Sequence, residues 1–198
     1  MKYIVSKHCG FCSGVKRAVE SAYKNAGENT VTYGELIHNK IVVDKLAEKG
    51  VTAVNDISQC IGKKVIVRSH GAGKDFFDKA SALGIEVIDA TCPFVKKIHD
   101  IVYRHYIDGY HIAIIGKAGH PEVEGTNGWC ENTASIVDDE KAAEALVHFE
   151  RVCFVTQTTY LLEKYLRILK KIRKLPFKTV EIFNTICYTT ISRQNDAE

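Results

Sequence analysis

Residues 86–92 read Glu86-Val87-Ile88-Asp89-Ala90-Thr91-Cys92, and residues 181–187 read Glu181-Ile182-Phe183-Asn184-Thr185-Ile186-Cys187. Each stretch is a short apolar and β-branched run, then a turn, then a cysteine in front of an expected helix. Near the start of the chain, Tyr3-Ile4-Val5 leads in the same way to Cys12 and to a helix from Gly14. The repetition predicts three αβ lobes, each presenting one thiol at a strand-to-helix junction.

Strand-like runs alternate with amphipathic segments along nearly the whole chain, which is typical of parallel α/β sheets. The expected strands are residues 2–5, 64–67, 85–88, 111–115, 134–137, 152–155 and 180–183. The expected helices are residues 14–26, 39–49, 74–83, 93–106, 140–148 and 160–173. We expect a first αβ lobe at 10–91, a second at 92–182, and only a stub of a third in 183–198 with 1–9.

Composition excludes several classes of protein. The chain has 198 residues, 45% of them hydrophobic, which supports a packed core and excludes a disordered chain. No apolar stretch approaches the roughly 18 residues of a membrane span, and residues 1–9 lack the apolar stretch of a secretory signal. The net charge of +3 comes from 27 basic and 24 acidic residues spread along the chain, so we expect no membrane and no nucleic-acid partner. Seven cysteines favour metal or redox chemistry in the reducing cytoplasm.

The cysteines allow two kinds of redox site. Three thiolates, one from each lobe, would hold an iron-sulfur cluster and leave one iron open to a substrate. Alternatively, Cys9-Gly10-Phe11-Cys12 lies between a strand and a helix, as in cytosolic dithiol oxidoreductases of the thioredoxin or glutaredoxin type. Cys60, Cys130 and Cys153 are typical of small buried hydrophobes.

Three histidines lie beside glycines in loops that follow strands: His38, His70 and His120. Imidazoles donate hydrogen bonds to phosphate oxygens, and helix N-termini favour the same anions. Arg68 is a competing phosphate ligand. These residues are also consistent with a non-catalytic, cluster-free module that binds diphosphate.

Two further residues suit proton transfer. Glu122 lies in the first turn of a helix that Pro121 starts, where a carboxylate complements the helix dipole. Held near an anion, the same carboxyl group binds its proton more tightly and becomes a general acid. Thr158, at the end of a strand, fits either a helix cap or a proton relay.

Taken together, the motifs resemble one family from residue 3 to Gln194, the LytB/IspH type of 4-hydroxy-3-methylbut-2-enyl diphosphate reductase. The motifs are Gly10-Phe-Cys-Ser-Gly-Val-Lys-Arg-Ala-Val19, Ile37-His38-Asn39, Ser69-His70-Gly71, Thr91-Cys-Pro93, Gly116-Lys-Ala-Gly-His-Pro-Glu-Val-Glu-Gly125, Thr156-Gln-Thr-Thr159 and Thr185-Ile-Cys187. The resemblance implies a pseudo-threefold α/β fold with parallel sheets around a central 4Fe-4S cluster.

The resemblance also implies residue roles. Cys12, Cys92 and Cys187 become the cluster ligands, and His38, His70 and His120 become the diphosphate contacts. Glu122 becomes the proton donor, and Thr158 the hydroxyl at the substrate alcohol.

In that family the reaction is the reductive dehydroxylation of 4-hydroxy-3-methylbut-2-enyl diphosphate to isopentenyl and dimethylallyl diphosphate. It is the last step of the non-mevalonate route to isoprenoids. Ferredoxin or flavodoxin is the implied electron donor, and the cytoplasm the implied location. The chain departs from the family where most of the third lobe would follow, so we expect a truncated form that by itself binds the diphosphate substrate weakly and reduces it poorly or not at all. Cys9 has no role in the family motifs.

Overall fold

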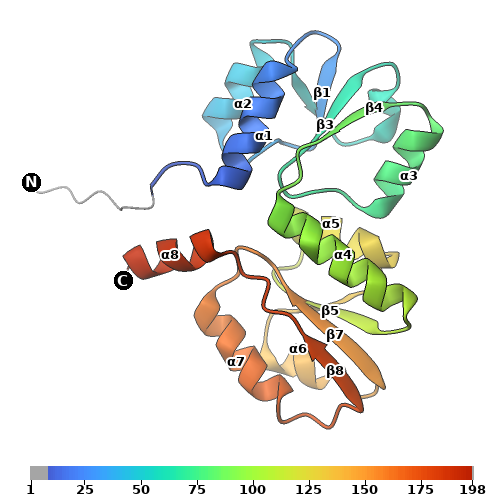
Figure 1. The fold of residues 1–198 in the computed structure, drawn as a ribbon, viewed down its shortest axis with the longest axis vertical. Coiled ribbons are helices and arrows are strands. Elements are labelled where there is room, and N and C mark those ends of the chain that lie inside the picture. The colour runs from blue at the N-terminus through green and yellow to red at the C-terminus, as the bar shows by residue number, and fades with distance from the viewer. Residues whose placement is uncertain (1–8, 198) are drawn as a thin grey trace, which may run out of the picture. The chain divides into compact units, whose positions relative to one another are not determined.

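The computed structural model describes residues 9–197 and divides the chain into two compact units (Figure 1). The first unit is Phe11–Lys96, and the second contains the described residues from 97 onward together with 9 and 10. We call them the first and second lobe. The expected strand at 2–5 lies outside the described residues, and the lobe limits expected from the sequence stay predictions.

The first lobe is a four-stranded parallel sheet in the order β2-β1-β3-β4. Its elements are α1 (Ser13–Lys24), β1 (Thr30–Tyr33), α2 (Lys40–Ala47), β2 (Thr52–Val54), the 3₁₀ turn η1 (Ile57–Cys60), β3 (Lys64–Val67), α3 (Lys74–Ala82) and β4 (Glu86–Asp89). Figure 1 shows α1 and α2 on one side of this sheet and α3 on the other.

The central strand β3 explains why both faces must be covered. Val65, Ile66 and Val67 are all fully buried, as expected for a parallel strand packed on two sides. Because successive side chains point to opposite faces, Ile66 joins the core under α1 and α2, whereas Val65 and Val67 join the core under α3.

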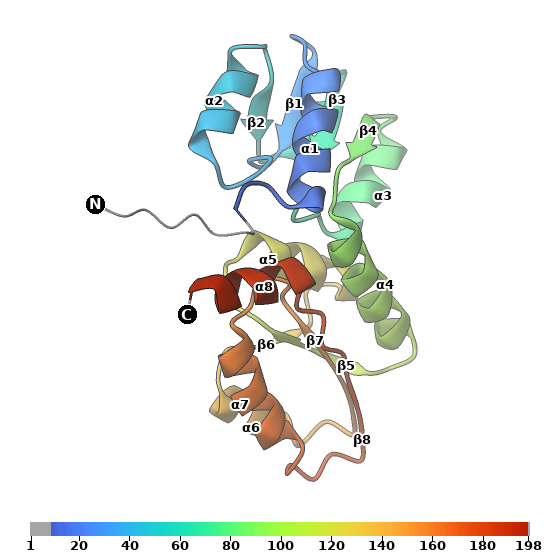
Figure 2. The same ribbon diagram turned by 60° about the vertical axis from the view of Figure 1, so that its left-hand side comes forward.

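The second lobe repeats this plan, with parallel strands in the order β6-β5-β7-β8. Its elements are α4 (Pro93–Ile107), which begins in the first unit, β5 (His111–Ile115), α5 (Pro121–Asn127), the 3₁₀ turn η2 (Gly128–Cys130), β6 (Ser135–Val137), α6 (Glu140–Glu144), β7 (Arg151–Thr156), α7 (Leu162–Ile172), β8 (Thr179–Ile182) and α8 (Tyr188–Ala197). Figure 2 shows the four strands of this lobe from another side.

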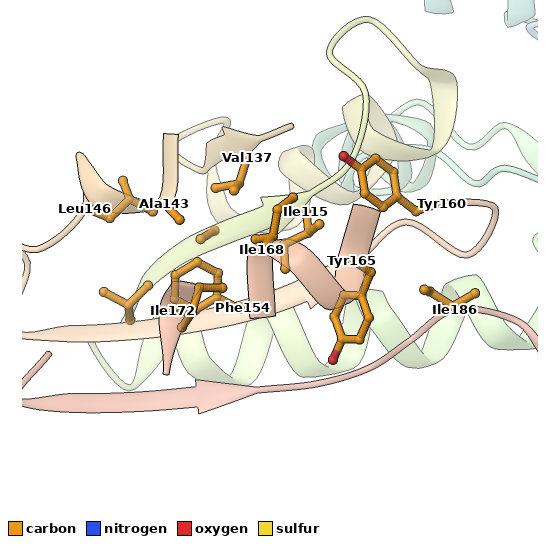
Figure 3. Packing of buried hydrophobic residues seen from close by; sticks show 12 residues of the cluster. Ile115, Val137, Ala143, Leu146, Phe154, Tyr160, Tyr165, Ile168, Ile172 and Ile186 are labelled. Carbon is orange, nitrogen blue, oxygen red and sulfur yellow. The ribbon is translucent and has the colours of Figure 1, made fainter. Parts of the chain in front are cut away.

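One face of the second sheet packs against α6 and α7, and the other against α4 and α5. Tyr165, Ile168 and Ile172 follow one another at helical spacing along α7 and are buried. They form one hydrophobic cluster with Phe154 of β7, and Figure 3 labels all of these residues. The outer strand β8 completes the sheet and leads directly to Cys187.

Most of the strands and helices expected between residues 39 and 182 are confirmed within a few residues, and so is the helix expected after Cys187, but two strands were missed. Strand β1 contains Thr30 and Thr32, and their polar side chains concealed a strand in which both are buried. Strand β2 was missed because it is only three residues long. No helix in residues 9–197 is long and apolar enough to cross a membrane.

We predict that the second lobe loses stability in mild acid because of His111. Its ring stacks on Phe149 at 3.6 Å between ring centroids, and burial, with His148 nearby, lowers the pKa of His111 below its usual value. The unfolded chain, with a histidine pKa near about 6.5, therefore binds the proton more readily. The free energy of unfolding should be highest above that pH and fall as the pH drops below it.

Urea denaturation at several pH values measures this dependence, and His111→Gln should flatten it. An equally steep loss of stability in the glutamine variant would show that another group is responsible.

Candidate active site

The two lobes repeat the same hydrogen bonds at the carboxyl ends of their strands. The Gly34 amide donates to the Val54 carbonyl at 2.7 Å, and the Gly116 amide donates to the Val137 carbonyl at 3.1 Å. A second pair of hydrogen bonds recurs after the last strand of each lobe. The Cys92 amide donates to the Ser69 carbonyl, and the Cys187 amide donates to the Thr158 carbonyl, both at 2.9 Å. This recurrence confirms that residues 86–92 and 181–187 are structural equivalents.

In the first lobe, Cys92 packs against the helix that follows Cys12. Cys12 is the N-cap residue of α1, and its side chain makes no capping hydrogen bond. A Cβ atom added to Gly14, in the first turn of α1, would lie 2.6 Å from the Cys92 Sγ, so only glycine fits there. Arg17 of α1 also donates to the Thr91 carbonyl. These contacts bring the segments that carry both thiols together.

The first lobe also brings two of the predicted histidines together. The rings of His38 and His70 lie 4.6 Å apart between centroids. The Ser69 amide donates to the Leu36 carbonyl at 3.3 Å, which joins the two histidine loops. Beside them Arg68 is half-buried, and this burial lowers the pKa of its guanidinium. Two imidazoles and a cation at one edge of the sheet are suited to a phosphate group.

In the second lobe, His120 caps α5. Its Nδ1 accepts the Glu122 amide hydrogen at 3.1 Å. Accepting through Nδ1 assigns the proton of a neutral ring to Nε2. Nε2 is then the nitrogen able to donate to a phosphate oxygen.

The Glu122 carboxyl group is the most deeply buried acid of the predicted site, with 2% exposure. Its Oε1 accepts the Thr158 amide hydrogen at 2.5 Å, and its Oε2 lies 2.6 Å from the Thr158 hydroxyl. Burial raises the pKa of Glu122 although the hydrogen bonds from Thr158 oppose the shift. A carboxyl group that keeps its proton at higher pH is suited to act as a general acid.

Close packing holds Glu122 in place. Val123 is buried in the core under α4 and α5, and a Cβ atom on Gly116 would lie 2.8 Å from the Val123 Cγ2. Gly116 therefore allows α5 to approach the end of β5 closely. Val123 anchors the helix turn that carries the acid.

The remaining cysteines differ in solvent exposure from Cys12, Cys92 and Cys187, which are all half-buried. Burial raises the thiol pKa of Cys60 and Cys130, and raises that of Cys153 to about 12. Cys60, Cys130 and Cys153 lie in hydrophobic cores, as the sequence predicted. Cys9 is exposed.

Sequence reasoning assigned no individual role to Arg17 and Thr185, two polar residues that organise the backbone around the candidate cysteines. Arg17 lies on an exposed helix face and offered no signal beyond its charge. Thr185 precedes Cys187 by two residues, and its hydroxyl contacts both backbone groups of Thr156. The recurrence of a threonine shortly before Cys92 and Cys187 was the available signal for Thr185.

Known proteins are similar to this chain along its whole length. The family model described as LytB protein matches residues 3–198. The 4-hydroxy-3-methylbut-2-enyl diphosphate reductase of Thermoanaerobacter sp. (strain X514) is 44% identical, and the alignment covers 100% of this chain and 71% of that protein. The protein of the same name from Clostridioides difficile (strain 630) is 42% identical, with 100% and 73% covered.

Two solved structures are also similar. One is (E)-4-hydroxy-3-methyl-but-2-enyl diphosphate reductase, described as the terminal enzyme of the non-mevalonate pathway. It matches with a TM-score of 0.81 and 35% identity over 98% of this chain and 70% of that chain. The other is E-1-hydroxy-2-methyl-but-2-enyl-4-diphosphate reductase from Plasmodium falciparum, with a TM-score of 0.84 and 30% identity over 94% of this chain and 61% of that chain.

We predict that Thr158→Val raises the pKa of Glu122 further, because valine removes a hydroxyl that stabilises the ionised carboxylate at Oε2. Carboxyl ¹³C chemical shifts followed over a pH titration measure the change. Thr158→Ser keeps the hydroxyl and should leave the midpoint close to that of the parent protein. A lower midpoint in the valine variant would contradict the assigned hydrogen bond.

Proposed function

The chain belongs to the LytB family, and from this premise we propose that it reduces 4-hydroxy-3-methylbut-2-enyl diphosphate to isopentenyl and dimethylallyl diphosphate. The observation that carries the proposal is the buried Glu122 carboxyl group held by Thr158. The chemistry requires an acid, because a hydroxyl group leaves far more readily as water. Two electrons and two protons convert the allylic alcohol into the alkene product and one water molecule.

For the substrate, we infer that the first lobe supplies His38 and His70 as diphosphate contacts and that the second supplies His120. The short distance between the rings of His38 and His70 supports a shared anionic ligand. His120 supports the same role through its Nε2 proton. Neutral imidazoles donate to phosphate oxygens, and a protonated imidazole adds charge to the same hydrogen bond.

For the cofactor, we infer that Cys12, Cys92 and Cys187 hold a 4Fe-4S cluster. All three thiols are half-buried and stand just before a helix, where the helix dipole favours a thiolate. Glycine at position 14 leaves room for the sulfur of Cys92, so the donors fit a thiolate-bound cluster. When bound, such a cluster supplies electrons and, with only three cysteine ligands, a Lewis-acidic iron.

Proton delivery follows from the residues of the second lobe. Protonated Glu122 donates its Oε2 hydrogen to the Thr158 oxygen, and the Thr158 hydroxyl hydrogen is then directed onward to the substrate alcohol. After transfer, the Thr158 amide still donates to Oε1 and stabilises the carboxylate. We further propose ferredoxin or flavodoxin as the electron donor. We also propose the cytoplasm as the location, because a high count of cysteines is typical of a reducing compartment.

The first test is iron retention after anaerobic reconstitution. Serine at Cys12, Cys92 or Cys187 should abolish stoichiometric iron and sulfide, because an alcohol replaces a thiolate ligand. Serine at Cys9 or Cys60 provides the matched control and should leave the iron content nearly unchanged. Iron loss in the Cys9 variant together with full retention in the Cys187 variant would contradict the ligand assignment. Colourless wild-type protein with a reversible Cys9–Cys12 disulfide would instead support a dithiol oxidoreductase.

The second test separates proton delivery from binding. Glu122→Gln keeps the shape of the side chain but removes the transferable proton. In a chain extended by a family-type third lobe, turnover with an artificial reductant should therefore fall about a hundred- to ten-thousand-fold. Iron content and diphosphate affinity should stay close to those of the parent protein. Undiminished turnover would reassign Glu122 to a structural role at the start of α5.

A further inference from the structure

The hydroxyl of Thr185 makes two backbone hydrogen bonds to one residue. It accepts the amide hydrogen of Thr156 at 2.8 Å and donates to the carbonyl of the same residue. Thr156 is the last residue of β7 and is fully buried. Thr185 therefore satisfies both backbone groups of Thr156, which lies beyond the last paired residues of β7 and β8.

This contact lies between two backbone hydrogen bonds that keep the segments after β7 and β8 together. Before it, the Phe183 amide donates to the Phe154 carbonyl at 2.8 Å. After it, the Cys187 amide donates to the Thr158 carbonyl at 2.9 Å. Thr185 thus continues the alignment of the two segments with a side chain, past the point where regular strand pairing ends.

Packing holds the same segment from the other side. Ile186, between Thr185 and Cys187, is 8% exposed and belongs to the core that contains Tyr160 and Tyr165. Figure 3 shows Ile186 at the end of this core nearest Tyr165. The position of Cys187 is consequently fixed by its buried neighbour Ile186, by the hydrogen bonds of Thr185 and by the hydrogen bond of its own amide.

The segment that Thr185 aligns also holds the acid. Thr158, whose carbonyl accepts from Cys187, donates its amide hydrogen to Glu122 and has its hydroxyl 2.6 Å from the same carboxyl group. We propose that Thr185 is a positioning residue that locks the Cys187 segment onto the Thr158 loop. Iron bound at Cys187 then orders the Glu122–Thr158 pair. The second statement rests on the proposed function, whereas the lock itself does not.

The chemistry restricts which side chains can fill this role. A hydroxyl group is both donor and acceptor, so threonine or serine serves both groups of Thr156. Valine has the shape of threonine but neither capability, and it would leave a buried amide and a buried carbonyl without partners. The pair Thr185→Val and Thr185→Ser therefore separates hydrogen bonding from packing.

A suitable control removes a similar bond elsewhere. Thr30, the first residue of β1 in the first lobe, is buried. Its hydroxyl donates at 2.7 Å to the carbonyl of Asn25, which precedes the strand. Thr30→Val should lower overall stability without affecting the second lobe's site. It measures how much of any change is general destabilisation.

Two measurements on the full chain test the proposal. The first is hydrogen exchange of the Thr158 amide by NMR, with and without a reconstituted iron-sulfur cluster. The second is the rate at which a chelator removes iron. Thr185→Val should speed both about ten-fold, whereas Thr185→Ser and Thr30→Val should stay within about two-fold of the parent protein. In the parent protein, loading iron should itself slow exchange at Thr158 about ten-fold, a comparison that needs no variant.

The outcomes separate the lock from the cofactor. Unchanged exchange at Thr158 in a folded Thr185→Val protein would overturn the lock. Equal exchange in the loaded and metal-free parent protein would overturn the statement that bound iron orders the Glu122–Thr158 pair. Faster exchange without faster iron loss would overturn the coupling between Cys187 and the acid. If the parent protein takes up no iron, the proposed function fails, and the exchange rates of the metal-free variants still decide whether Thr185 is the lock.

Discussion

Burial of the Glu122 carboxyl group against Thr158 is the constraint on which the second lobe's site depends. Transferring an isolated charge into a protein interior is costly, so the carboxyl group stays protonated to higher pH unless hydrogen bonds compensate. Thr158 supplies two such bonds, which require the loop after β7 to approach α5. Gly116 and the buried Val123 make this approach possible. The same loop also positions the segment that carries Cys187, because the Cys187 amide donates to the Thr158 carbonyl.

The first lobe uses the same framework for different chemistry. Its loops are tied together by the equivalent hydrogen bond from Cys92 to Ser69, and Ser69 is buried like Thr158. The adjoining residues, however, are the imidazoles of His38 and His70. A repeated αβ unit thus provides equivalent backbone positions, and the proposed diphosphate contacts and the proposed proton donor differ in the side chains placed there.

Local sequence patterns were sufficient to predict a strand or a helix where one or both of its faces are apolar. Strands β3, β5 and β7 are continuous apolar runs buried on both sides, and α7 has a regular buried stripe, so all four were predictable. Strand β1 was missed because its threonines are polar in sequence and buried in the fold. The candidate ligands and the acid were proposed from cysteine, histidine and glutamate beside glycines at strand ends together with the resemblance to the LytB/IspH family, and their roles stay predictions.

What the sequence determined by itself was therefore the alternation of strands and helices, the repeated cysteine junctions and the residue types available for chemistry. Only the tertiary structure decided which polar groups meet, because hydrogen bonds such as those of Thr185 with Thr156 and of Arg17 with Thr91 join residues far apart in the chain. The raised pKa of Glu122 belongs to the same category. Its cause is desolvation by residues packed from several elements, and no local pattern in the sequence records that packing.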